Sequence, residues 1–238
     1  MKFPAPALSL LLSLAIPLAG QAQEEESPFT AEVELGAVLT TGNTEDENIN
    51  FNASVDYERN DWTFGASIDG FRSSKKNVLA AHRMYYVATA DYSFAENEFI
   101  EGRVAHDVDR FSGFDSQSDV SVSYGRNFLT NIENMELAAT FGAGMRRSRL
   151  PDREIDEAIL RFSGEYVWSI SSNADFNQDL STEFGEQNSI FRSESSIETR
   201  IVENLALRFA IALKHQTDVP IGRKKTDTET SVTFVMSF

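Results

Sequence analysis

Apolar and polar residues alternate along most of the chain with a period of two. Between Asn48 and Glu58, apolar residues occupy every second position from Ile49 to Tyr57, and polar residues fill the positions between them. Successive side chains of a β-strand point to opposite faces, so this pattern predicts a strand with one apolar and one polar face. Similar stripes cover 62–68, 84–94, 137–143, 160–168, 176–184, 205–213 and 232–238, with weaker ones at 33–39, 100–108, 120–124 and 191–201.

The connections between these stripes alternate in length. Short turns at 59–61, 95–97, 130–134, 171–173 and 203–204 alternate with longer segments at 72–83, 110–117, 146–156 and 215–226, and 186–188 is the exception. Short turns on one rim and long loops on the other are typical of transmembrane barrels, whose termini lie on the short-turn side. The sequence therefore predicts an all-β fold, a closed antiparallel transmembrane β-barrel of about twelve strands.

Periodicity alone leaves open which face of the strands meets the apolar phase, because a soluble ligand-binding barrel would turn its apolar face inward. Aromatic residues near strand ends, at Trp62, Tyr92, Phe94, Trp168 and Phe238, fit interfacial girdles. The other face carries charges that would pair across strands in a polar lumen, and both features favour a membrane barrel. The candidate lumen charges are Asp56, Glu101, Arg103, Asp107, Arg161, Glu165, Asp175, Asp179, Glu198, Arg200 and Arg208.

Residues 1–22 have the layout of a cleaved secretory signal. Lys2 precedes an apolar run from Ala7 to Leu18, and Ala22 ends a stretch that includes small residues. The run is shorter than the roughly 18 apolar residues that a membrane-spanning helix needs. We therefore expect a signal peptide at 1–22, a periplasmic segment at 23–30 and a single outer-membrane barrel domain at 31–238.

The composition narrows the classes of partner. The formal net charge is −16, and removal of residues 1–22 takes away Lys2 as the only charged residue, which leaves −17. A chain this acidic is not expected to bind nucleic acid. The sequence has no cysteine, so neither disulfides nor thiolate chemistry are available. As an outer-membrane barrel, the chain is expected to meet membrane lipid and, during biogenesis, the barrel-assembly machinery.

Four segments resemble the YdiY-like, salt-induced outer-membrane proteins, domain-of-unknown-function family 481. They are Leu35-Gly36 leading into Thr41-Gly42-Asn43-Thr44, the run from Asp109 to Asp115, the run from Phe176 to Leu180, and Pro220 followed by Lys224-Lys225-Thr226-Asp227. Together they span nearly the whole mature chain. The resemblance implies an outer-membrane β-barrel with no established activity and a link to salt or stress response.

Candidate chemistry is sparse, and we predict no cofactor, no metal ion and no catalytic residue. Thr41 to Thr44 is typical of a turn, and Asp109 to Asp115 lacks the spacing of a Ca²⁺ loop, so a folded loop is favoured there. His82, His106 and His215 are the histidines. His106 lies beside Asp107 and close to Ser112, which leaves an interfacial lipase-type or protease-type enzyme using His106 or His215 as an alternative.

Basic residues gather in the predicted long loops. Arg and Lys bind phosphate through charge-assisted hydrogen bonds, so this rim is a candidate surface for lipopolysaccharide. The candidate contacts are Lys75, Lys76, Arg146, Arg147, Arg149, Arg223, Lys224 and Lys225. The function that we expect is a structural or small-solute channel role with a charged lumen. The alternatives are an interfacial enzyme and a soluble periplasmic lipid-binding barrel.

Overall fold

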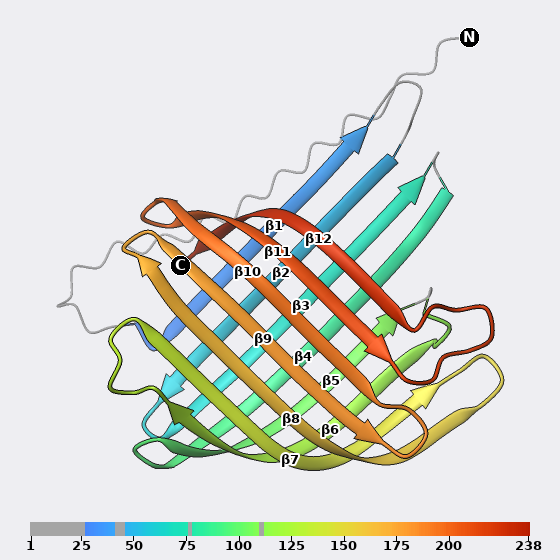
Figure 1. Ribbon diagram of the computed structural model, residues 1–238, viewed down its shortest axis with the longest axis horizontal. Helices are drawn as coiled ribbons and strands as arrows, with labels where there is room; N and C mark the ends of the chain where they lie inside the picture. The colour runs from blue at the N-terminus through green and yellow to red at the C-terminus, as the bar shows by residue number, and fades with distance from the viewer. Residues whose placement is uncertain (1–26, 41–45, 76–77, 110–111) are drawn as a thin grey trace.

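The computed structural model describes residues 27–40, 46–75, 78–109 and 112–238. Twelve β-strands account for most of these residues (Figure 1), which confirms the predicted number. They are β1 (Phe29–Thr40), β2 (Asp46–Arg59), β3 (Trp62–Lys75), β4 (Val78–Ala95), β5 (Glu98–Asp109), β6 (Ser116–Phe128), β7 (Met135–Arg149), β8 (Glu154–Ser171), β9 (Ala174–Gly185), β10 (Ile190–Val202), β11 (Leu205–Gln216) and β12 (Thr226–Ser237). In this part of the chain, no helix is long and apolar enough to cross a membrane.

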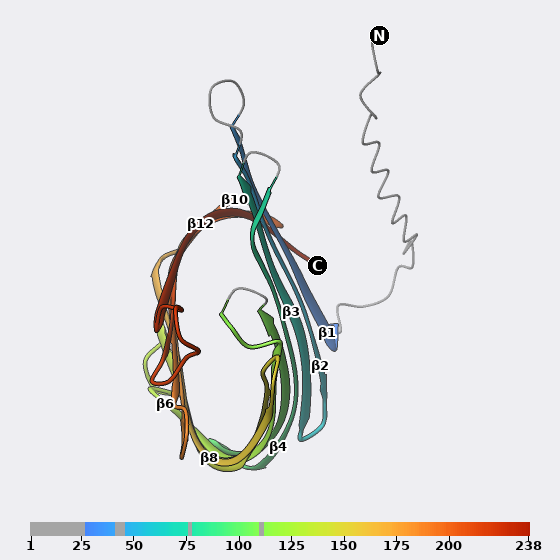
Figure 2. The same ribbon diagram turned by 90° about the vertical axis from the view of Figure 1, so that its right-hand side faces the viewer.

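The strands form one closed antiparallel barrel, in which each strand pairs with its sequence neighbours and β1 pairs with β12. Figure 2 shows the ring that they enclose. Turns of two residues join β2 to β3, β4 to β5, β8 to β9 and β10 to β11. The N–H of Phe238 donates to the carbonyl of Ala31 at 2.9 Å, so the start of β1 and the end of β12 meet. Both strand ends therefore lie on the short-turn rim, as predicted.

The apolar face of each strand points out of the barrel. Val122, Met145 and Val232 are 61%, 59% and 58% exposed, whereas the lumen-facing Arg103, Asp107 and Glu183 are 5%, 5% and 1% exposed. A soluble barrel would bury the first set and expose the second. The alternative of a soluble lipid-binding barrel with an inward apolar face is therefore wrong, because the apolar side chains form an outer belt suited to a bilayer.

Aromatic rings line the outer surface at the short-turn rim. The ring centroids of Trp62 and Tyr92 lie 5.0 Å apart, and those of Phe94 and Tyr124 lie 6.3 Å apart. Trp168 is exposed near the end of β8. Such rings are amphipathic and suit the level of lipid headgroups. The predicted aromatic girdle is present at this rim.

Two of the predicted long loops are strand instead. Within 72–83, β3 runs to Lys75 and β4 begins at Val78, and Arg72 pairs with His82 in the ladder. Within 146–156, β7 continues to Arg149 and β8 begins at Glu154. At 146–149 and 154–157 both faces of β7 and β8 carry polar residues, so the period-two signal ends there although the backbone ladder continues.

Some expectations concern parts of the chain outside the described residues. The signal peptide at 1–22 and residues 23–26 of the predicted periplasmic segment are among them, as is the motif at 41–44. The barrel itself begins at Phe29, two residues before the predicted domain start at 31. The cleavage site therefore stays a prediction.

Glycines bring β6 and β7 together on the lumen side. A Cβ atom at Gly142 would lie 2.2 Å from the carbonyl oxygen of Val122, and one at Gly144 would lie 2.1 Å from that of Val120. Real Cβ atoms do not approach so closely, so larger residues would push the two strands apart. Ser121 and Ser123, the partners of these glycines in register, are also small and are both 2% exposed. Small residues on this wall leave room in the lumen for longer side chains from other strands.

We expect Gly144→Ala to destabilise the barrel by about 1–3 kcal/mol, because the new methyl group would overlap the β6 backbone. Gly164→Ala is the matched control, since a Cβ there would lie 3.8 Å from its nearest neighbour, the carbonyl oxygen of Ala138. The measurement is the urea midpoint at which the unheated protein loses its fast-migrating band on a gel. Equal midpoints for the two variants would contradict the close approach of β6 and β7.

Candidate functional site: a charged network and an acidic cavity in the lumen

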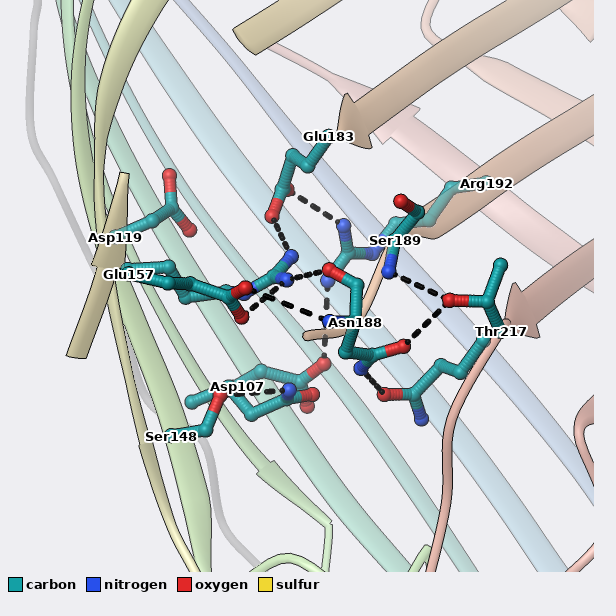
Figure 3. A network of polar contacts seen from close by, with 12 residues as sticks. Asp107, Asp119, Ser148, Glu157, Glu183, Asn188, Ser189, Arg192 and Thr217 are labelled. Carbon is teal, nitrogen blue, oxygen red and sulfur yellow. Dashed lines mark hydrogen bonds and ion pairs between the residues drawn. The ribbon is translucent and has the colours of Figure 1, made fainter. Parts of the chain in front are cut away.

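A buried arginine joins three strands in the lumen. The guanidinium of Arg146, on β7, donates to Glu157 on β8 at 2.8 Å and to Glu183 on β9 at 2.9 Å. The three side chains are 1%, 3% and 1% exposed. A buried ion needs a partner and hydrogen bonds to offset its lost hydration, and each charge here has both. Figure 3 shows Glu157 and Glu183 facing each other across this contact.

The same network continues across the barrel. Glu183 also accepts from Arg192 on β10 at 2.8 Å, and Arg192 lies 3.5 Å from Asp107 on β5. Lys214 on β11 donates to Asp107 at 2.7 Å. Because β5 and β11 are six places apart in a ring of twelve strands, these bonds join opposite walls. We call Asp107, Arg146, Glu157, Glu183, Arg192 and Lys214 the cross-lumen network.

The loop between β9 and β10 is tied into this network. The carbonyl of Asn188 accepts from Arg146, and the N–H of Gln187 donates to Glu157 at 2.9 Å. The Asn188 side chain, in turn, donates to Gln216 at 3.0 Å and accepts from the Asp218 N–H at 3.1 Å. Asn188 is 5% exposed, so this loop bends into the barrel mouth (Figure 3). Two loops are thereby fixed to one side of the network.

Two more arginines reach inward next to the network. Arg103 donates to Asp119 and to the Tyr85 hydroxyl. Arg161 donates to Glu101 at 3.1 Å and to the Ser163 hydroxyl at 3.2 Å. These long side chains occupy the space that the small residues of β6 and β7 leave free.

An acidic cavity of about 230 Å³ lies between Arg161 and the short-turn rim. Its carboxylates come from Asp56, Asp91, Glu101 and Glu165, and the other lining residues are Thr89, Phe99, Ala138, Thr140 and Ser163. Glu101 is paired with Arg161. Within the described part of the chain, the other three carboxylates make no ion pair, so the cavity carries excess negative charge. Carboxylates on low-dielectric walls concentrate cations and exclude anions.

The row of acids extends along the lumen wall beyond this cavity. Glu165 is level with Asp179 on β9, and Asp179 is level with Glu194 on β10. On the same wall, Arg208 contacts Glu198 at 2.7 Å and also bonds Glu34 on β1. The lumen therefore has a compact, charge-paired half near the longer loops and an acidic half near the short turns.

The structure brings most of the predicted lumen charges together. Three ion pairs inside the barrel contain predicted charges: Glu101 with Arg161, Glu198 with Arg208, and Asp107 with Lys214. The acidic cavity is lined by Asp56 and Glu165. Arg103 and Asp179 face the lumen nearby. Asp175 pairs in register with Glu198, and Arg200 lies exposed at the short-turn end of β10. Sequence reasoning missed further lumen charges, among them Glu34, Asp91, Asp119, Glu157, Glu183, Arg192, Glu194 and Lys214.

Arg146 was predicted as a lipopolysaccharide contact, and that expectation is wrong because the side chain is buried in the lumen. Its neighbours Arg147 and Arg149 are exposed and paired with Asp156 at 2.7 Å and Glu154 at 2.8 Å. Arg223, Lys224 and Lys225 are exposed in the loop between β11 and β12, and Lys225 donates to the carbonyl of Thr217. The side chain of Lys75 and all of Lys76 lie outside the described residues.

The grouping of His106 with Asp107 and Ser112 is wrong. His106 is exposed on the outer face, whereas Asp107 points into the lumen, and Ser112 donates to the carbonyl of Asp109 at 2.9 Å. The Nδ1 of His106 instead lies 2.7 Å from the hydroxyl of Ser118, and that of His215 lies 2.8 Å from Thr226.

The backbone around Ser118 belongs to the ladders with β5 and β7, so its N–H groups are not free to stabilise an oxyanion. Among the described residues, no group of three or more His, Asp or Glu side chains is arranged to hold a metal ion.

Comparison with known proteins agrees with this fold. A family model described as "Protein of unknown function, DUF481" matches residues 33–238. The uncharacterized protein YdiY of Escherichia coli (strain K12) is 24% identical over 203 residues, which cover 82% of this chain and 77% of that protein.

Two solved structures share the architecture. The NanC porin has a TM-score of 0.55 at 10% identity, with 87% of this chain and 98% of that chain covered. An outer membrane channel from Pseudomonas putida F1 has a TM-score of 0.51 at 11% identity, with 94% of this chain and all of that chain (100%) covered. At such identities the likeness concerns the fold.

Replacing Arg146 by Met should destabilise the barrel by about 3–5 kcal/mol, because buried Glu157 would lose its basic partner and buried Glu183 would keep only Arg192. The next residue gives a matched control: Arg147→Met breaks only an exposed, solvent-screened pair with Asp156, so its urea midpoint should stay close to that of the unmodified protein. Urea midpoints of the gel-mobility shift measure both. If Arg146→Met were as mild as Arg147→Met, the cross-lumen network would not be a buried structural unit.

Proposed function

The chain belongs to the family described as "Protein of unknown function, DUF481", and we propose that it works as an outer-membrane channel for small solutes that prefers cations. The observation that carries this proposal is the acidic cavity, where Asp56, Asp91 and Glu165 have no basic partner among the described residues. Burying carboxylates without a basic partner costs free energy unless water or a bound cation solvates them. A cavity lined by such groups therefore favours a role in passage or binding of cations. The apolar outer belt and the fold shared with porins support the membrane setting.

The cross-lumen network sets the size limit in this proposal. Solutes that enter from the short-turn side pass the acidic cavity and then meet Arg161 and the ion pairs from β5 to β11. In this proposal only ions and very small solutes pass this level, because the bonded side chains narrow the lumen there. Wide diffusion of the kind seen in large porins is not part of this proposal.

A closed structural barrel is the second candidate, and the same network favours it. Lys214 donates to Asp107 across the lumen at 2.7 Å, and such contacts between opposite walls are also what a fully closed lumen would contain. Current measurement separates the two candidates, because a closed barrel is silent. The link to salt response, which the family resemblance implies, stays a prediction that protein abundance at raised NaCl concentration would check.

In a planar bilayer with a KCl gradient, we expect small current steps and a zero-current potential of the sign that K⁺ preference gives. Neutralising the cavity with Asp91→Asn and Glu165→Gln should move this potential toward zero, because the field that attracts cations is weakened. Asp156→Asn is the control, since this carboxylate is 53% exposed and lies on the outer face. A silent wild-type protein, or anion preference, would refute the channel.

Lipopolysaccharide contact is a separate proposal for the rim of longer loops, where Arg223 and Lys224 are exposed. We expect the double change Arg223→Ala and Lys224→Ala to weaken binding of purified lipopolysaccharide about three- to tenfold, through loss of charge-assisted bonds to phosphate. Arg126→Ala is the control, because Arg126 is exposed at the opposite rim. Unchanged binding in the double variant would remove this partner.

A further inference from the structure

The ladder between β1 and β12 stops halfway along the two strands. Its paired residues run from Glu32 opposite Ser237 to Leu35 opposite Phe234. Every other edge of these strands is paired much further: β1 pairs with β2 up to Thr40, and β12 pairs with β11 down to Thr226. Beyond Leu35 the two strands therefore present backbone edges that are not paired with each other.

The point where the strands separate is well defined. A Cβ atom at Gly36 would lie 2.9 Å from both Thr233 and the carbonyl oxygen of Val232, so the backbones still touch there. Past this point β1 runs on with β2 and β3 beyond the ring, while β12 turns away along the opposite wall (Figures 1 and 2). On the outer face, Leu35 and Val232 are 57% and 58% exposed, which places this gap in the apolar belt.

Side chains replace the missing ladder on the lumen side. Glu229 of β12 accepts from Asn50 of β2 at 2.6 Å and from Arg83 of β4 at 3.1 Å. Arg83 also contacts Asp69 of β3 at 3.1 Å. We call Asn50, Asp69, Arg83 and Glu229 the seam clasp. Past Leu35, separating β1 from β12 therefore requires polar side-chain contacts to break, whereas the other ladders of these two strands run nearly their full length.

We propose that the gap between β1 and β12 is a lateral opening, in which a single-chain amphiphile with a positively charged headgroup binds between the bilayer and the lumen. The gap has hydrocarbon on its outer side and polar groups on its inner side, so an occupant must be apolar at one end and polar at the other. Unpaired backbone groups are costly in lipid, and a hydrated headgroup at the gap relieves that cost. This inference rests on the barrel seam and is independent of ion conduction.

The sign of the headgroup follows from the charges behind the gap. Arg83 contacts two carboxylates, Asp69 and Glu229. Arg208 is surrounded by three more, Glu32, Glu34 and Glu198. Five carboxylates thus face two guanidinium groups on the lumen side of the seam. A cationic headgroup offsets this excess, whereas an anionic one adds to it.

Labelling of single cysteines tests the opening, because the chain contains no native cysteine. Ser231 on β12 and Ser196 on β10 both face the lumen, and both pair in register with Ala210 of β11. They therefore lie at the same level, but only Ser231 is at the seam. A long-chain alkyl maleimide dissolved in the bilayer should label Ser231→Cys and leave Ser196→Cys unlabelled. Equal labelling of the two positions, or none at either, would refute the opening.

Protection against that label tests the headgroup. Dodecyltrimethylammonium should slow labelling of Ser231→Cys, and dodecyl sulfate at the same concentration should not. Adding Glu229→Gln should raise the protecting concentration about tenfold, through loss of one charge-assisted contact of about 1.5 kcal/mol. Glu194→Gln is the matched control, because Glu194 and Glu229 both pair in register with Ala212. Protection by both surfactants, or by neither, would overturn the cationic ligand.

A second copy of the chain is the other possible occupant of the open edge, and its presence would overturn the proposal. Thr228 is exposed on the outer face of β12 beside the gap. If two copies paired there, Thr228→Cys would form disulfide-linked dimers in dilute liposomes. With an amphiphile as the occupant, Thr228→Cys should remain monomeric under the same oxidising conditions.

Discussion

Every backbone N–H and C=O group in hydrocarbon needs a hydrogen-bond partner within the protein, and this requirement shapes the whole molecule. It forces the twelve strands to close, so that β1 meets β12. Closure then divides all side chains into those that face lipid and those that face the lumen. Among the ladders of the described residues, the one between β1 and β12 is the shortest, and past Leu35 the seam clasp of polar side chains takes its place.

Charged side chains, mainly arginines, fill much of the lumen. Small residues such as Gly142, Gly144 and Ser121 line the wall at β6 and β7, and a barrel of this size would otherwise be left with empty space. Arginines fill it, since their long stems reach across and their guanidinium groups satisfy several carboxylates at once. Acidic side chains outnumber basic ones toward the short turns, so the two ends of the lumen differ in charge.

The sequence predicted the barrel well because one physical rule, the alternation of faces, acts on every strand. It placed Asp107 and Arg161 in the lumen for the same reason. It could not place Arg146, whose neighbours Arg147 and Arg149 suggest a basic loop, because strand continuation there depends on pairing with Glu154–Glu157 and not on hydrophobicity. Nor could it join Asp107 to Lys214, since contacts across the lumen leave no spacing signal along the chain.

The connection at 186–188 is the exception to the alternation of short and long connections, and the burial of Asn188 gives a reason. Asn188 is bonded to Arg146 and to Gln216, and Gln187 is bonded to Glu157, so the middle of this segment is anchored in the lumen. Insertions should therefore be tolerated poorly here, whereas the exposed tip at 221–224 of the loop between β11 and β12 is free to lengthen and diversify. Surface variation among relatives should accordingly concentrate on one side of the mouth and leave the other side conserved in length.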